Sequence, residues 1–304
     1  MKHAHALKPG DTIGIAAPAS PFDRHVFLKG VHAIEQMGFK VFFRKDIFDQ
    51  NRYFAGTDQR RADEFMELMT DRNIAAVMFA RGGYGSQRVI PLLKADLLRQ
   101  HAKPVLGFSD VTALLAFLRQ SAGVPTFYAP VVTQLGREPH SMTMDSLSRA
   151  LTTAGPLGAI ASSGARCMKP GNARGPLVGG CLSLINSSMG TQYELDTSGA
   201  ILFIEEVGEK VYVLDRMLTQ LKNSGAIAKA NAVVFGSLKL PDGEKHDVSA
   251  MLADVMSDFE GPVVTDFPAG HSDEFVTLPL GAAAELTADA GAEPILTFTE
   301  GLLS

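Results

Sequence analysis

The feature that most constrains the fold of this chain is an alternation of short β-type runs with amphipathic helices through its first half. Hydrophobic runs predict strands at residues 12–17, 40–43, 75–80 and 104–108. Helical spacing of apolar residues predicts helices at residues 26–37, 58–71, 87–98 and 110–120. Such alternation favours a parallel sheet covered on both faces, with its ligand site beyond the carboxyl ends of the strands. Polar residues that directly follow strands are therefore the candidates for chemistry.

The second half repeats an α/β pattern after an interruption. Residues 137–172 are rich in Ser, Thr, Gly, Ala and Pro, and we expect a helix at 141–152 followed by a connecting segment. Further strands are predicted at residues 201–204, 232–235, 263–265, 275–278 and 295–298, with a helix at 211–222. We therefore predict an N-terminal α/β domain over residues 1–140, a linker over 141–172 and a C-terminal domain over 173–304.

Composition and charge exclude several classes of protein. The chain has 304 residues, is 46% hydrophobic and carries a net charge of −5, so we expect a folded protein without a broad basic surface for nucleic acid or anionic lipid. The two cysteines, Cys167 and Cys181, lack the spacing of a disulfide scaffold or a cysteine-rich zinc site. No apolar run approaches the ~20 residues of a membrane span, and no secretory leader is evident. We expect a soluble, cytoplasmic protein.

Ser109 is the first candidate for chemistry. A hydrophobic strand ends at Phe108 and a helix begins at Asp110, so Ser109 sits in a sharp strand-to-helix turn for which Gly107 provides space. This is the geometry of a nucleophile elbow, although Val111 replaces the second glycine of G-x-S-x-G. The same pattern also fits a serine that merely caps a helix.

The glycine turn that begins at Arg81 (Arg-Gly-Gly-Tyr-Gly) is the second candidate. It follows a predicted strand and precedes a predicted helix, so its backbone N–H groups could hold a phosphate, a carboxylate or an oxyanion. It matches neither G-x-G-x-x-G nor a Walker motif, which gives little support to a nucleotide-dependent enzyme. A tight turn that needs glycine only for positive φ remains an alternative.

Two acids and one histidine also follow predicted strands. Glu205 and Glu206 end the strand at 201–204, and they must point to opposite faces because they are adjacent. His271 lies in the loop after the strand at 263–265, where an imidazole could act as a base. A strand end that meets water and a solvated loop histidine are the plainer alternatives.

Together these residues supply the parts of an activated nucleophile. A serine hydroxyl needs a base to take its proton, and the base needs an acid that orients it. The order Ser, Glu, His, with the serine in the first half and its partners in the second, predicts a catalytic site between the two domains.

Six segments of the chain resemble the LD-carboxypeptidase family of serine peptidases, in the family's order. They span about residues 7 to 285 and begin at Pro9 (PGDTIGIAAPAS), Arg81 (RGGYG), Gly107 (GFSDVT), Gly175 (GPLVGGCLS), Ile204 (IEEVGE, with LDRML from Leu214) and Phe267 (FPAGH). The resemblance implies an N-terminal domain with a parallel, flavodoxin-like sheet and a C-terminal α/β domain with a partly barrel-like, β-rich core. It also implies that members are commonly dimers.

The resemblance implies a triad of Ser109, Glu205 and His271, with no metal or cofactor. The family usually has Glu-Asp where this chain has Glu205-Glu206, and the first of the pair is catalytic. The expected oxyanion donors are the backbone N–H groups of Asp110 and Gly83. Cys181 stands where the family commonly has Asn. From its chemistry, Arg81 is a candidate to bind the substrate's free carboxylate.

The expected activity is removal of the C-terminal D-amino acid from murein tetrapeptide, as part of peptidoglycan recycling. One alternative is a peptidase of the same fold that cleaves a peptidyl-nucleotide antibiotic of the microcin C type. Another is a non-catalytic, two-lobed small-molecule binding protein. We expect a small peptide substrate, no nucleic-acid or membrane partner, and a homodimer.

Overall fold

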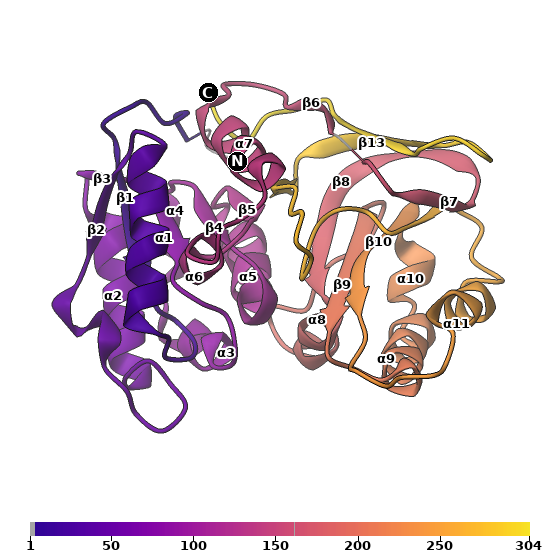
Figure 1. Cartoon of the computed structure of the whole chain (residues 1–304), viewed down its shortest axis with the longest axis horizontal. Helices are drawn as coiled ribbons and strands as arrows, with labels where there is room; N and C mark the ends of the chain where they lie inside the picture. Colours follow the sequence, from indigo (N-terminus) through magenta and orange to yellow (C-terminus); the bar gives the residue numbers. More distant parts are fainter. Residues whose placement is uncertain (1–3, 161) are drawn as a thin grey trace.

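The computed structural model describes residues 4–160 and 162–304, which form two β-sheets, each flanked by helices (Figure 1). The first sheet contains five parallel strands and an antiparallel edge strand, in the order β12-β5-β4-β3-β1-β2. Its strands are β1 (Thr12–Ala16), β2 (Lys40–Phe43), β3 (Ile74–Phe79), β4 (Val105–Gly107), β5 (Thr126–Tyr128) and β12 (Leu278–Leu280). The predicted parallel sheet is confirmed.

Side-chain caps and buried stripes explain where the first helices form. Asp23 accepts a hydrogen bond from the Val26 N–H at 2.8 Å and starts α1 (Arg24–Gln36). Thr57 does the same for α2 (Asp58–Thr70). Both helices bury an apolar stripe against the first sheet and its neighbours. α5 (Thr112–Ala122) ends at Gly123, whose φ of 64° suits glycine.

The helix predicted at residues 87–98 is wrong as a single element. The segment is divided into α3 (Ser86–Val89), the 3₁₀ turn η2 (Ile90–Leu92) and α4 (Ala95–Gln100). Pro91 lies at the break, because it has no N–H to continue the α-helical hydrogen bonds.

The second sheet is mixed, in the order β6-β14-β13-β8-β9-β10-β11-β7. Its strands are β6 (Gly158–Ile160), β7 (Arg166–Lys169), β8 (Gly171–Cys181), β9 (Ile201–Val207), β10 (Ala232–Lys239), β11 (Val263–Thr265), β13 (Ala283–Ala288) and β14 (Ile295–Phe298). Strands β8 to β11 are parallel, and the others are antiparallel to their neighbours. The accompanying helices are α8 (Leu182–Ser188), α9 (Val211–Asn223), α10 (Ala226–Lys229) and α11 (Val248–Val255).

Two expectations for the second half need correction. The segment 141–172 begins with the predicted helix, α7 (Ser141–Thr152), but β6, β7 and the start of β8 occupy much of the remainder, which we expected to be a linker. β6 and β7 are only three and four residues long, so their pairing depends on partners far away in sequence. The strand expected at 275–278 is β12, which lies two to three residues later and joins the first sheet next to β5. The domain limits at residues 140 and 173 remain a proposal.

One apolar core runs from the first sheet into the second. It includes Phe79 and Leu106 of the first sheet together with Phe203 and Val234 of the second. The two carboxyl-terminal strand edges are therefore held in a fixed relation by packing. Among the described residues, no helix has the length and apolarity needed to cross a membrane.

Candidate active site

Ser109 follows β4 in a strained conformation. Its φ is 66°, in the left-handed region that costs a non-glycine residue about 1–2 kcal/mol. A Cβ on Gly107 would lie 2.6 Å from Phe79 and 2.8 Å from Val111, which is why the turn needs glycine there. The N-cap residue of the 3₁₀ turn η3 (Ser109–Val111) is Phe108, so Ser109 is the first residue inside the turn. Ser109 is therefore not the capping residue of this turn, and its positive φ agrees with the sharp strand-to-helix turn expected from the sequence.

The glycine turn packs directly against this elbow. Gly83 has a φ of 100°, and a Cβ on Gly82 would lie 3.0 Å from Ser109 Cβ and 3.2 Å from Ser109 Oγ. The same Cβ would lie 3.4 Å from the Asp110 nitrogen. Within residues 4–160 and 162–304, neither the Gly83 nor the Asp110 N–H donates a hydrogen bond, so both can serve an incoming acceptor.

The carboxylate of Asp110 ties the turn to the elbow, a role that the sequence analysis missed. It accepts hydrogen bonds from the backbone N–H groups of Gly85 at 3.2 Å and Ser86 at 2.8 Å. The Ser86 hydroxyl donates back to the Asp110 carbonyl at 2.7 Å. Burial raises the pKa of Asp110, while the two N–H donors act in the opposite direction. These contacts fix the position of the two candidate oxyanion donors.

Glu205 and His271 form the second part of the site. Glu205 is fully buried near the end of β9, and its Oε2 accepts hydrogen bonds from His271 Nδ1 at 2.7 Å and from the His271 backbone N–H at 3.0 Å. A carboxylate that accepts from Nδ1 leaves Nε2 with its lone pair, as a base requires. A Cβ on Gly270 would lie 2.6 Å from Glu205 Oε2, so only glycine permits this approach.

Glu206 points to the other face of β9. Its carboxylate accepts from the Ser183 N–H at 2.7 Å and from its neighbour Val207 N–H at 2.9 Å, and the Cys181 thiol donates to it at 3.4 Å. Burial, the largest cause, and the two nearby acids raise the pKa of Cys181 well above its usual value. Glu206 makes no hydrogen bond to the described atoms of His271.

Ser109 and His271 face a common cavity of about 830 Å³ that both halves of the chain line. Ser109 and His271 do not hydrogen-bond to each other in this conformation. Phe108, the sequence neighbour of Ser109, packs on the imidazole of His271, with 4.7 Å between the ring centroids. Arg81 is exposed at the cavity and donates to the Pro21 carbonyl at 2.6 Å. Other charged residues on the wall are Arg137, Glu138, Glu206, Glu209, Lys239 and Asp273.

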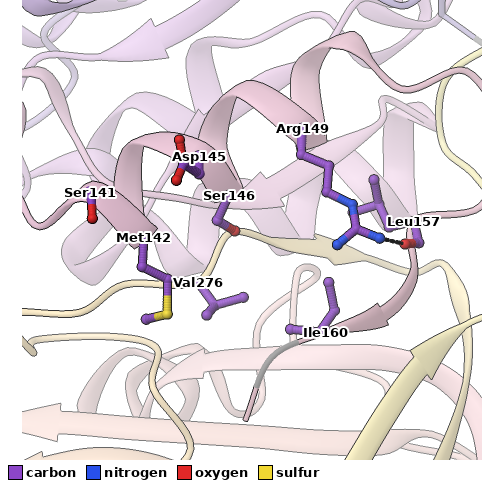
Figure 2. A pocket seen from close by; sticks show the side chains of 8 residues that line it. All are labelled: Ser141, Met142, Asp145, Ser146, Arg149, Leu157, Ile160 and Val276. Atoms are coloured by element: carbon purple, nitrogen blue, oxygen red, sulfur yellow. Dashed lines mark hydrogen bonds between the residues drawn. The ribbon is translucent and has the colours of Figure 1, made fainter. Parts of the chain in front are cut away.

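A smaller cavity of about 270 Å³ lies along α7 and contains no predicted site residue (Figure 2). Figure 2 shows Arg149 reaching from α7 to donate a hydrogen bond to the Leu157 carbonyl. Met142, Ile160 and Val276 make much of the remaining wall apolar. Its lining contains no histidine, whereas the larger cavity is lined by both Ser109 and His271, so the larger cavity is the candidate active site.

Tyr128 is a further residue of the site that the sequence analysis did not identify. Its hydroxyl lies 2.5 Å from Glu205 Oε1 and 3.2 Å from the Ser109 nitrogen. Thr-Phe-Tyr in a short apolar strand is typical of a buried core, and no spacing rule distinguishes this tyrosine from a packing residue. Its position at the end of β5 was the only available signal.

The contact between Gly82 and Ser109 yields a testable prediction. We expect Gly82→Ala to lower kcat/KM by about 10²-fold, because the added methyl displaces the Ser109 hydroxyl by a fraction of an ångström. The melting temperature measured by circular dichroism should change little in comparison. An active Gly82→Ala variant would contradict the tight contact between turn and elbow.

The comparison with known families agrees with this geometry. Residues 13–129 match the LD-carboxypeptidase N-terminal domain, and residues 174–286 match the LD-carboxypeptidase C-terminal domain. The probable murein peptide carboxypeptidase of Bacillus subtilis is 34% identical over 305 residues, which cover 98% of this chain and 96% of the relative. The microcin C7 self-immunity protein MccF of Escherichia coli is 28% identical, over 94% and 93% of the two chains.

Solved structures share the whole fold. The muramoyltetrapeptide carboxypeptidase from Oxalobacter formigenes superimposes with a TM-score of 0.85 at 28% identity, over 95% of this chain and 98% of that one. MccF in complex with aspartyl sulfamoyl adenosine gives a TM-score of 0.92 at 26% identity, with full coverage of both chains. These matches overturn the alternative of a non-catalytic binding protein. The chain belongs to the LD-carboxypeptidase family and is a serine carboxypeptidase.

Proposed function

We propose that this enzyme removes the C-terminal D-amino acid of murein tetrapeptide, with Ser109, His271 and Glu205 as its catalytic triad. One observation carries the proposal: the buried Glu205 holds His271 Nδ1 at 2.7 Å, beside a cavity that also contains Ser109 on its strained elbow. The similarity to carboxypeptidases of murein peptides supports the choice of substrate.

In the proposed mechanism, Ser109 Oγ attacks the carbonyl carbon of the last amide while His271 Nε2 takes the hydroxyl proton. The N–H groups of Gly83 and Asp110 stabilise the oxyanion, and each donor of this kind contributes about 10²–10³ in rate. His271 then gives the proton to the departing amine, and the C–N bond breaks. Water, deprotonated by His271, hydrolyses the ester on Ser109 and restores the enzyme.

The assay is mass spectrometry of L-Ala-γ-D-Glu-meso-diaminopimelate-D-Ala before and after incubation with the enzyme. We expect conversion to the tripeptide and free D-Ala, and no conversion with Ser109→Ala. A folded wild-type sample that leaves the tetrapeptide intact would refute the proposed substrate.

Arg81 is proposed to bind the terminal carboxylate of the substrate, since its guanidinium lies at the cavity and is oriented by Pro21. We expect Arg81→Ala to raise KM about tenfold or more, with a smaller effect on kcat, because a charge-assisted hydrogen bond is lost. A tetrapeptide ending in D-Ala amide is the matched control. If Arg81→Ala affects the acid and the amide equally, Arg81 does not bind the carboxylate.

The similarity to MccF supports a second candidate function, hydrolysis of a peptidyl-nucleotide antibiotic of the microcin C type. Aspartyl sulfamoyl adenosine is a suitable test substrate, because MccF has been solved in complex with it. If turnover of this compound exceeds that of the tetrapeptide, the antibiotic is the better assignment.

We also propose that the enzyme acts in the cytoplasm, on peptides recovered during peptidoglycan recycling, and that it is a homodimer, as the family resemblance implies. Cell fractionation tests the first statement. Light scattering coupled to size-exclusion chromatography tests the second, for which a monomeric mass would be the contrary result.

A further inference from the structure

Tyr128 connects the two halves of the site. It is the last residue of β5 in the first sheet, and it is fully buried. Its hydroxyl lies within hydrogen-bonding distance of the nucleophile's backbone, at Ser109 N, and of the acid from the second sheet, at Glu205 Oε1. No other described side chain hydrogen-bonds to both of these residues.

The direction of the two hydrogen bonds follows from their chemistry. The Ser109 N–H can only donate, so the tyrosine oxygen accepts from it. The tyrosine proton is then directed to Glu205 Oε1, which as a carboxylate can only accept. Burial, and secondarily the charge of Glu205, raises the pKa of Tyr128 well above 10, so the hydroxyl keeps its proton.

Packing fixes the position of this hydroxyl. The Tyr128 ring lies 5.4 Å from the ring of Phe203, 5.9 Å from that of Phe275 and 6.0 Å from that of Phe108, measured between centroids. Phe108 and Phe275 also pack on each other at 5.0 Å, and Phe108 packs on His271. Tyr128, which donates to Glu205, therefore belongs to the same aromatic cluster as the residues that pack on the imidazole of His271.

Glu205 is left with a complete set of partners. Its Oε2 serves His271, and its Oε1 serves Tyr128. Without the tyrosine proton, Oε1 would be a buried charged atom with no donor among the described residues, and only the two hydrogen bonds from His271 to Oε2 would orient the carboxylate.

We propose that Tyr128 is a positioning residue for the carboxypeptidase reaction, whose hydroxyl holds the Ser109 backbone at the elbow and orients Glu205 toward His271. This inference rests on the proposed roles of Ser109, Glu205 and His271. It adds one direct link through which the nucleophile in one half and the acid–base pair in the other keep their relative positions.

The test is Tyr128→Phe, which removes only the hydroxyl. We expect kcat on the tetrapeptide to fall about tenfold to a hundredfold with KM little changed, because both the elbow and the acid lose a hydrogen bond. We also expect the acidic limb of the kcat/KM profile to move to higher pH. Without the tyrosine hydrogen bond, the negative charge of Glu205 is stabilised by one donor fewer. The carboxylate then stabilises the protonated imidazole of His271 more strongly.

The shift of the pH profile separates positioning from a purely structural role, which would lower the rate without moving the limb. Tyr212→Phe, which removes a hydroxyl from a side chain that is 60% exposed, is the matched control and should equal the wild type. A Tyr128→Phe variant with wild-type kcat, or with an unmoved acidic limb, overturns the inference.

Two further arms keep the result decisive. If Tyr128→Phe does not fold, 3-fluorotyrosine can be placed at position 128, because it retains the shape of tyrosine and is a stronger hydrogen-bond donor. The acidic limb of the kcat/KM profile should then move to lower pH, and an unmoved acidic limb overturns the inference. Ser109→Ala reports on the proposed function itself. If Ser109→Ala is inactive while Tyr128→Phe is unchanged, only the inference about Tyr128 fails.

Discussion

Ser109→Ala is expected to lower kcat/KM on murein tetrapeptide by a factor of about 10⁴ or more, because the variant lacks the hydroxyl that the elbow presents to the cavity shared with His271. The fold should persist, since the Ser109 hydroxyl makes no hydrogen bond to the described residues. Activity is measured by release of D-Ala, and folding by the melting temperature.

Ser109→Gly provides a control that alanine cannot. Both variants lack the hydroxyl and should be equally inactive, but glycine adopts a φ of 66° without strain. We therefore expect Ser109→Gly to be more stable than Ser109→Ala by about 1 kcal/mol in denaturant unfolding. A Ser109→Ala enzyme with more than a few per cent of wild-type activity would contradict the assignment of the nucleophile.

Glu205→Gln has the second largest expected effect, a fall in kcat of about 10³–10⁴-fold. The glutamine amide can turn its NH₂ group toward His271 Nδ1, and the imidazole then carries its proton on Nε2, where it cannot accept the proton of Ser109. Turnover and the pH profile are measured on the same tetrapeptide.

Glu206→Gln is the matched variant, because the two acids are adjacent and both are buried. Glu206 accepts hydrogen bonds from the N–H groups of Ser183 and Val207 rather than from the imidazole. The fall in kcat should therefore be at least about 100-fold smaller for Glu206→Gln than for Glu205→Gln. The reverse order of the two effects would assign the acid to Glu206.

The local part of the fold could be predicted where a parallel strand has its own hydrophobic run, as in β1 to β4 and β9 to β11, whereas the parallel strands β5 and β8 were not predicted. The limits of β2 and β11 agree with the sequence expectation residue for residue. β6, β7 and β12 could not be predicted with their partners, since these strands are short and their pairing is decided by segments distant in the chain. Pro91 is a local signal for a break in the helix predicted at residues 87–98, but the helical spacing of the apolar residues favoured one continuous helix.

The candidate site was predictable where a residue type and a strand end coincide. Ser109, Glu205 and His271 each follow or end a strand, and the family resemblance gave their roles. Which of the two acids contacts the imidazole is decided by the direction of the side chains on β9 and by the space that Gly270 leaves. Tyr128 and the Asp110 carboxylate act through contacts across the fold, which no local pattern encodes.

The return of β12 to the first sheet has a consequence for the synthesis of the protein. β5 obtains its outer neighbour only from residues 278–280, and the backbone of Ala4 pairs with that of Leu303, so the first and last segments that the structure describes lie together (Figure 1). A nascent chain on the ribosome therefore carries its nucleophile in an unfinished sheet with an open edge, which is prone to pairing with other chains. A chain synthesised only as far as β5 also lacks Glu205 and His271, the proposed acid and base, so we expect it to be inactive.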